Sequence, residues 1–169
     1  PVCSFTAEEI WASMPARNTD TVMLATWYRD LPTMDDALRA RMQRLRAVRE
    51  TVGPRLEALR RDKAIGSSLA AEVTLEANGA VREDLEAIGD ELRFLLLTAE
   101  ARLGSVETAD EAARIDDGAV RVAVVPSPEP KCIRCWHHRP DVGVEPAHPE
   151  ICRRCVANVS GGGERRQWG

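Results

Sequence analysis

Two pairs of closely spaced cysteines constrain the fold of this chain more than any other feature of its sequence. Cys132 and Cys135 form the first C-x2-C pair, and Cys152 and Cys155 form the second, sixteen residues further on. This spacing is typical of two thiolate knuckles that share one tetrahedral structural zinc ion. Two disulfides or four free thiols are the alternatives, but disulfides suit secreted proteins and nothing else in the sequence indicates secretion.

The residues around these cysteines predict a module that depends on its metal. The segment is short, rich in Pro, Gly, Arg and His, and poor in aliphatic side chains, so it cannot bury a core of its own. Zinc binding supplies on the order of 10–16 kcal/mol in comparable small modules. His137, His138 and His148 lie nearby, but four cysteines already complete a tetrahedral site, so we expect the histidines to support the ligands or lie at the surface.

Basic and aromatic residues flank the predicted zinc ligands. Four thiolates around one Zn²⁺ leave a formal charge of about −2, and Lys131, Arg134, Arg153 and Arg154 are placed to offset it. The same groups beside Trp136 would suit stacking on unpaired bases and contact with phosphates. The alternative is that Trp136 packs over the knuckle, and the two roles are compatible.

Composition limits the classes of partner. The chain has 169 residues and a net charge of −4, which excludes a protein that coats nucleic acid with its whole surface. Residues 126–169 nevertheless carry seven basic and five acidic groups, so a polyanion would meet local patches. No apolar run long enough to span a membrane and no basic-then-apolar leader is present, which predicts a cytoplasmic protein without a membrane partner. A start at Pro1 rather than Met suggests a fragment or a processed end.

The first 35 residues predict a short helix and an extended segment. Thr6 and Glu9 match a capping box, with Phe5 and Ile10 as a hydrophobic staple, so a helix is expected over 7–14, ending before a proline. An extended apolar segment over 21–28 should then contribute packing residues, which are Met23, Leu24, Trp27 and Tyr28. Cys3 is expected to be a small buried residue.

The longest helical pattern runs from 35 to 63. Apolar residues recur every three or four positions and predict a face that packs on a neighbouring helix; they are Leu38, Met42, Leu45, Val48, Val52, Leu56 and Leu59. Gly53-Pro54 predicts a kink or a break. The polar face is rich in arginine, including Arg41, Arg44 and Arg55, which is typical of a solvated surface and also compatible with contact to an RNA backbone.

The middle of the chain predicts a small α/β unit. Alternation over 73–77 indicates a strand, residues 81–88 a short helix, and 92–98 and 120–125 two further strands. The acidic stretch 109–118 is expected to be a surface loop or short helix, and 125–130 a stiff proline-rich linker. The predicted fold class is α+β, with a helical segment at 1–68, a junction domain at 69–125 and a zinc domain at 126–169. No phosphate-binding loop or nucleophile elbow is present, so no catalytic residue is predicted.

Several ordered motifs resemble the C-terminal region of bacterial-type isoleucyl-tRNA synthetases. They include SFTAEEIW at 4–11, KAIGSSL at 63–69, EVTL at 72–75, K-C-x-R-C-W-H at 131–137 and GGGER at 161–165. The resemblance implies the end of a helical anticodon-binding domain, a junction domain, and a zinc domain that helps to hold the anticodon arm of isoleucine tRNA. It also implies that the ATP-dependent catalytic domain and the editing domain lie upstream, outside this chain. The residues expected to contact tRNA are Arg41, Arg44, Arg55, Lys131, Arg134, Trp136, Arg153, Arg154, Arg165 and Trp168.

The sequence is compatible with two other hypotheses about the zinc module. The zinc module could bind another protein, with Trp136 and Trp168 as interface anchors; Trp168 stands where the synthetases usually have Phe. The module also resembles that of formamidopyrimidine-type DNA glycosylases, which use an N-terminal proline amine as nucleophile. Pro1 is present here, but Val2 replaces the acidic residue that follows proline in that family.

Overall fold

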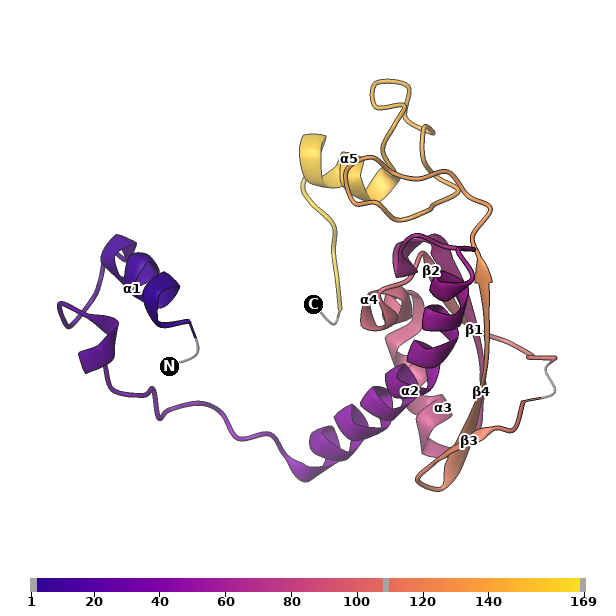
Figure 1. Ribbon diagram of the computed structural model, residues 1–169, viewed down its shortest axis with the longest axis horizontal. Helices are drawn as coiled ribbons and strands as arrows, with labels where there is room; N and C mark the ends of the chain where they lie inside the picture. The colour runs from indigo at the N-terminus through magenta and orange to yellow at the C-terminus, as the bar shows by residue number, and fades with distance from the viewer. Residues whose placement is uncertain (1–2, 108–109, 168–169) are drawn as a thin grey trace. The chain divides into compact units, whose positions relative to one another are not determined.

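The computed structural model describes residues 3–107 and 110–167, shown in Figure 1. The chain divides into two compact units, Pro1–Asp35 and Asp36–Gly169. The three-domain division expected from the sequence, at 1–68, 69–125 and 126–169, stays a prediction. Within the described ranges, no helix has both the length and the hydropathy that a bilayer span requires.

The first unit consists of helix α1 (Ser4–Ser13) and the 3-10 turn η1 (Val22–Leu24). Hydrogen bonds join the two: the Glu8 carboxylate accepts from the Thr21 hydroxyl at 2.8 Å and from the Val22 backbone N–H at 3.1 Å. The indole N–H of Trp11 donates to the carbonyl of Thr19 at 2.9 Å. None of the described residues in this unit is buried, so polar contacts rather than an apolar core hold it together.

Four predictions for this unit are wrong. Helix α1 begins at Ser4 with Cys3 as its N-cap, so Thr6 lies inside the helix and cannot cap it. The proposed staple is absent, because the exposed fractions of Phe5 and Ile10 are 91% and 59%, and Cys3 is exposed. The apolar residues over 21–28 are also exposed, since this short unit provides no second layer to cover them; they are Met23, Leu24, Trp27 and Tyr28.

The second unit is built on a four-stranded mixed sheet in the order β2-β1-β4-β3. The strands are β1 (Ala71–Ala77), β2 (Glu100–Leu103), β3 (Ala113–Ile115) and β4 (Gly118–Pro126). β1 pairs in parallel with β2 and antiparallel with β4, while β3 and β4 form an antiparallel hairpin. Alternate residues of β1 are fully buried, Val73 and Leu75 among them, so one face of the sheet carries the core.

Helix α2 (Asp36–Arg61) covers this apolar face together with α3 (Gly79–Ile88), η3 (Gly89–Glu91) and α4 (Leu92–Leu96), as Figure 1 shows. Its buried stripe contains Leu45, Val48, Val52 and Leu56. The stripe contacts β4 and β3 as well as α3 and α4, so the predicted partner, a neighbouring helix, is only part of the interface. The helix is continuous through Gly53-Pro54 and no break occurs, because Pro54 lies on the exposed side while Val52 and Leu56 keep the packing.

Helix α2 ends in a Schellman motif. The backbone N–H of Ala64 donates to the carbonyl of Leu59 at 2.9 Å, and that of Lys63 donates to Arg60 at 3.1 Å. Lys63 adopts the left-handed conformation, with φ of 58°, at the position where glycine is usual. The turn directs the chain through η2 (Ser68–Ala70) into β1.

Two predictions for this unit are wrong. Residues 92–98, predicted as a strand, form α4 and end at Leu97 in the left-handed conformation, and the strand follows as β2. The acidic stretch 109–118, predicted as a loop or short helix, contains β3 in its described part. The hairpin brings Gly118 against Asn78, where a Cβ would lie only 2.3 Å from the Asn78 carbonyl oxygen, so only glycine fits.

The zinc module follows β4 directly. The predicted linker over 125–130 does not act as a free spacer: its first two residues belong to β4, and Ser127 donates its backbone N–H to Ala70 and its hydroxyl to Glu72, both at 2.8 Å. Helix α5 (Arg153–Ser160) is the regular helix of the module within its described residues. Helices, a small mixed sheet and the cysteine module together confirm the predicted α+β class.

Candidate metal centre

The four predicted ligands meet at one point. The Sγ atoms of Cys132, Cys135, Cys152 and Cys155 all lie within 4.8 Å of one another. The Cys132–Cys155 and Cys135–Cys152 pairs are each 3.7 Å apart. A tetrahedral zinc ion with Zn–S bonds of about 2.3 Å requires sulfur–sulfur distances of about 3.8 Å, so the cluster has the size that one Zn²⁺ needs.

Local backbone geometry sets these positions. In the first knuckle the Trp136 N–H donates to the Cys132 carbonyl at 2.9 Å, with Trp136 in the left-handed region at φ of 65°. Cys152 is the N-cap of α5, which places Cys155 in its first turn. The Cys152 N–H points at the Cys132 sulfur at 3.4 Å, a contact that stabilises a thiolate.

The thiols have very different intrinsic acidities without a metal. Burial opposes ionisation of Cys132, but N–H groups of Cys135, Cys152 and Arg134 outweigh it and lower the pKa of Cys132 to about 6. Burial raises the pKa of Cys152, with a further increase from Cys135 next to it, and burial also raises the pKa of Cys135. Several buried thiolates cannot coexist without a cation, so the donor set fits a divalent, thiophilic ion.

The neighbouring histidines are used elsewhere. His137 donates its Nδ1–H to the Cys135 carbonyl at 3.1 Å, and His138 donates its Nδ1–H to the Glu129 carbonyl at 2.6 Å. His148 Nε2 lies 2.9 Å from the Ser160 hydroxyl. Among the described residues the metal cluster consists of the four cysteines, and the histidines form hydrogen bonds with the surrounding loops and with α5.

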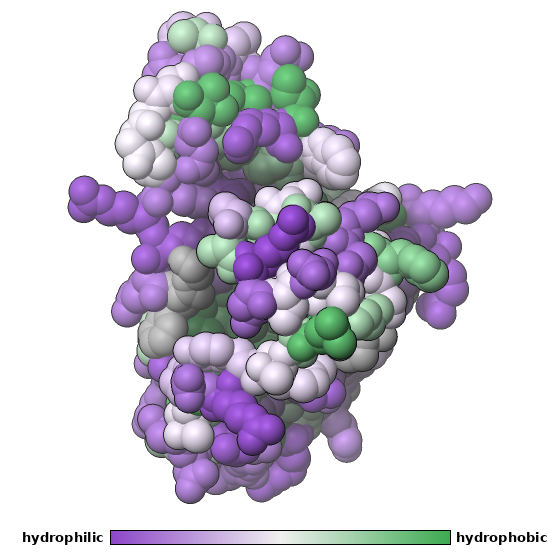
Figure 2. All heavy atoms as spheres, turned by 90° about the vertical axis from the view of Figure 1, so that its left-hand side faces the viewer, coloured by the Kyte–Doolittle hydropathy of each residue, from purple (hydrophilic) through white to green (hydrophobic). Residues whose placement is uncertain are grey.

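The surface of the module presents basic and apolar groups to solvent. Trp136 is 62% exposed, and the ammonium of Lys131 lies 5.5 Å from the centroid of its ring. The Arg134 guanidinium donates to the Cys155 sulfur at 3.7 Å, while Arg153 and Arg165 are exposed. At the top of Figure 2, where the module lies, apolar side chains are interspersed with hydrophilic ones at the surface.

The other predicted tRNA contacts are engaged within the protein. Arg44 donates to the nearly buried Asp84 at 2.6 Å, and Arg41 approaches the same carboxylate at 3.6 Å. Two further arginines hold carboxylates outside α3: Arg55 donates to Asp110 at 3.0 Å and Arg154 to Glu164 at 2.6 Å. Trp168 lies outside the described residues.

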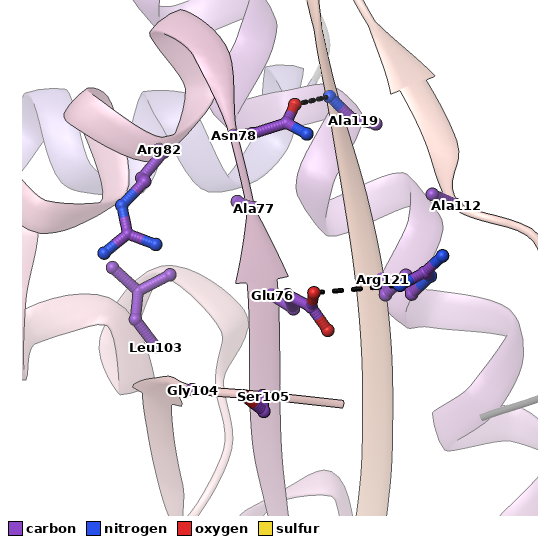
Figure 3. A pocket seen from close by; sticks show the side chains of 10 residues that line it. All are labelled: Glu76, Ala77, Asn78, Arg82, Leu103, Gly104, Ser105, Ala112, Ala119 and Arg121. Atoms are coloured by element: carbon purple, nitrogen blue, oxygen red, sulfur yellow. Dashed lines mark hydrogen bonds and ion pairs between the residues drawn. The ribbon is translucent and has the colours of Figure 1, made fainter. Parts of the chain in front are cut away.

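A polar pocket of about 460 Å³ lies at the end of β1, away from all the predicted site residues (Figure 3). Its polar groups already have partners in the protein. Asn78 accepts from the Ala119 N–H at 2.9 Å, Glu76 pairs with Arg121 at 3.7 Å, and Arg82 pairs with Glu86. Since these groups satisfy one another, the pocket is not a candidate active site.

Sequence reasoning missed a cluster between the zinc module and α4. The ring of Phe94 is surrounded by the guanidinium groups of Arg93, Arg154 and Arg166, and His137 meets it edge-on. From the sequence, Arg154 is predicted only as a tRNA contact and His137 only as a support for the zinc ligands or a surface residue. No local pattern marks the others, because they come from segments that the fold alone brings together.

A four-cysteine knuckle-and-helix module mounted on a small mixed sheet defines a zinc-finger protein. Residues 129–158 match the family described as a zinc finger found in FPG and IleRS, and this match together with the cluster confirms zinc as the predicted cofactor. The assignment of the four cysteines as its ligands stays a prediction.

The chain as a whole is similar to bacterial isoleucine–tRNA ligases. It is 47% identical to the isoleucine–tRNA ligase of Alkalilimnicola ehrlichii over 99% of this chain and 19% of that protein. It is 45% identical to those of Azotobacter vinelandii and Halorhodospira halophila, over 99% and 98% of this chain and 18% of each ligase. The resemblance to the C-terminal region of these synthetases is therefore confirmed, and the chain spans about a fifth of the length of these relatives.

Proposed function

We propose that this chain is the tRNA-binding C-terminal part of an isoleucine–tRNA ligase, which holds the anticodon arm of isoleucine tRNA and performs no chemistry by itself. The observation that carries the proposal is the exposed ring of Trp136 with Lys131 against it, on a zinc module flanked by arginines. The relatives that match almost the whole chain bear the name isoleucine–tRNA ligase, which supports the choice of amino acid and tRNA.

The chemistry of this surface suits an unpaired RNA loop. An exposed indole offers a stacking platform worth about 1–3 kcal/mol per base, and Lys131, Arg134 and Arg153 add positive charge for phosphates. Backbone contacts of this kind release counterions, so binding should weaken steeply as salt rises. The α2 arginines are secondary candidates, because Arg41 and Arg44 already pair with Asp84, which would compete with RNA phosphates for them.

Zinc supports this role structurally. The ion would be held by the four cysteines and would supply the rigidity of the two knuckles from which Trp136 projects. Arg134 beside the Cys155 sulfur would offset part of the negative charge of the thiolate cluster. ATP, isoleucine and the editing reaction would belong to upstream domains, and the exposed apolar residues of Pro1–Asp35 would pack against the preceding helical domain.

The test is binding of the zinc-loaded chain to an isoleucine tRNA anticodon stem-loop and to a noncognate stem-loop, at two salt concentrations. We expect preference for the cognate loop and loss of affinity with salt. The double variant Trp136→Ala with Arg153→Ala should weaken binding at least tenfold while keeping one zinc per chain. Arg82→Ala, which removes an exposed arginine paired with Glu86 on α3, is the matched control and should leave binding unchanged.

Unchanged binding by the double variant would contradict the placement of the RNA contacts on the zinc module. The protein-interaction hypothesis would be favoured by two results together. The fully zinc-loaded chain would show no RNA affinity at low salt, and it would capture a partner protein independently of RNA. The glycosylase reading rests on Pro1 and Val2, which lie outside the described residues, and it predicts a borohydride-trapped adduct with lesion-containing DNA. The whole-chain similarity to ligases supports the tRNA reading instead.

A further inference from the structure

Phe94 joins three segments that are distant in sequence. It belongs to α4, and its ring centroid lies 3.9 Å from Cζ of Arg166 in the C-terminal tail (residues 161–167) and 5.0 Å from Cζ of Arg154 in α5. Arg93, next to it on α4, lies 4.7 Å from the centroid. The ring of His137, in the first knuckle, approaches at 6.3 Å with an interplanar angle of 73°. One aromatic ring, in the helices and sheet of residues 36–126 (called the junction unit below), therefore contacts both the zinc module and the tail.

Ion pairs fix the tail in this arrangement. Glu164 accepts from Arg154 at 2.6 Å and pairs with Arg166 at 3.2 Å, so one carboxylate holds both of the guanidinium groups that face Phe94 from outside α4. The Glu164 N–H donates to Asn158 at 2.9 Å. At the far end of the tail, the Gln167 N–H donates to Glu91 at 2.5 Å. The tail thus turns back from α5 and docks beside α4.

Further hydrogen bonds join the first knuckle and the loop after it to the sheet. The His138 N–H donates to the Leu69 carbonyl at 3.0 Å, and Arg139 donates to the Ala99 carbonyl at 3.1 Å and to Glu100. These contacts fasten the module near the start of β1 and β2. They do not involve α5 or the tail, whereas the attachment through Phe94 does, and this second attachment fixes the orientation of the module.

The ring of Phe94 lies beside a guanidinium group that is not fully hydrogen-bonded. Among the described residues, the buried Nε of Arg93 has no hydrogen-bond partner. Burial lowers the pKa of Arg93, the neighbouring charges of Arg139 and Arg154 lower it further, and Glu100 and Asp141 oppose this shift. The face of Phe94, through its quadrupole, therefore adds to the attraction that these carboxylates and Glu164 exert on a crowded set of cations.

We infer that Phe94 is a positioning residue: with Arg154 and Arg166 it fixes the orientation of the zinc module against the junction unit, and so sets where Trp136 and Lys131 meet RNA. Only the predicted effect on RNA binding rests on the proposed function. The orientation itself is a property of this chain that can be measured without RNA.

The substitutions Phe94→Leu and Phe94→Tyr separate this role from simple space-filling. Leucine keeps an apolar side chain but has no ring, whereas tyrosine keeps the aromatic face. Phe94 lies outside the buried core under the sheet, so neither change should unfold the junction unit. In the tail, Arg166→Gln and Arg165→Gln remove the same charge at adjacent positions, but only Arg166 contacts the ring.

The measurement is amide hydrogen exchange of the zinc-loaded full chain, followed in the tail and in residues 136–141. We expect Phe94→Leu and Arg166→Gln to speed exchange in both segments about tenfold, the effect of losing one to three cation–π contacts. Phe94→Tyr and Arg165→Gln should match the unmodified chain, as should zinc content and exchange in β1 for all four variants. Equal exchange for the leucine and tyrosine variants, or for the two arginine variants, would overturn the inference.

An RNA arm then tests the consequence for function. If the unmodified chain binds the anticodon stem-loop, Phe94→Leu should reduce affinity at least fivefold with Trp136 intact, and Phe94→Tyr should restore it. Undiminished affinity of the leucine variant would refute the link between orientation and RNA binding. If the unmodified chain binds no RNA, the proposed function fails, while the exchange results still decide whether Phe94 orients the module.

Discussion

Removal of zinc should unfold the zinc module and leave the junction unit folded. The buried cluster of the module contains only Cys132, Cys152 and Cys155, with Cys135, Val142 and Ile151 partly buried against it. Even complete burial of Val142 and Ile151 would contribute no more than about 6 kcal/mol. Zinc binding contributes about 10–16 kcal/mol, which exceeds the contribution of both side chains, so the module cannot retain its fold without the ion.

The assay is amide hydrogen exchange before and after chelation, with zinc measured on the same samples. A loss of 4 kcal/mol or more should accelerate exchange of protected amides in residues 131–160 by about a thousandfold. Amides of β1 and β4 should keep their protection, because Val73, Leu75 and Val122 belong to a separate core. Cys132→Ser should reproduce the effect of chelation, while Cys3→Ser, an exposed cysteine outside the cluster, should not.

Two results would refute this reasoning. Protection of residues 131–160 that persists after the zinc has gone would mean that side-chain packing, and not the metal, supports the module. Simultaneous loss of protection in β1 would mean that the two cores are one cooperative unit, contrary to the separation of their buried clusters.

Three further substitutions test the fold. Leu75→Ala, at a fully buried site of β1, should lower the free energy of unfolding by about 2–5 kcal/mol in urea titrations. Lys63→Gly should raise it by about 0.5–1 kcal/mol, because glycine relieves the left-handed strain at the end of α2; a decrease would show that the lysine side chain stabilises the turn. Arg44→Ala should cost about 1–3 kcal/mol by stripping the nearly buried Asp84 of its closest partner, whereas the exposed Arg49→Ala should cost less than about 0.5 kcal/mol.

The zinc site could be read from the sequence because its information is local. A C-x2-C pair fixes two thiolates on one turn of backbone, and the second pair repeats the device, so their spacing alone predicts a shared ion. The strand predicted over 73–77, which lies within β1, could be recognised equally well, since one buried face imposes a period of two. The long helix was recognised for the same kind of reason, as a stripe with a period near 3.6.

The wrong predictions concern mainly apolar segments, because the sequence does not show which surface packs against them. Residues 92–98 have the composition of a buried strand, but the chain turns there in the left-handed conformation and the strand forms three residues later. The capping box at Thr6 was a correct local pattern that the helix did not use. Exposed Trp27 and Tyr28 show the same limit, because apolar residues indicate burial only where a partner surface exists.

The sequence by itself indicated the zinc cofactor, the α+β class and the relationship to isoleucine–tRNA ligases, and it predicted the metal ligands, since each depends on residue identity and spacing along the chain. Only the tertiary structure decided which cations are available to a partner. In the folded chain Arg41 and Arg44 pair with Asp84, Arg154 pairs with Glu164, and Arg166 lies against Phe94. Lys131 and Arg153 are exposed. The physical reason is that an arginine's function depends on the anion or ring nearest to it in space, and long-range packing sets that neighbour.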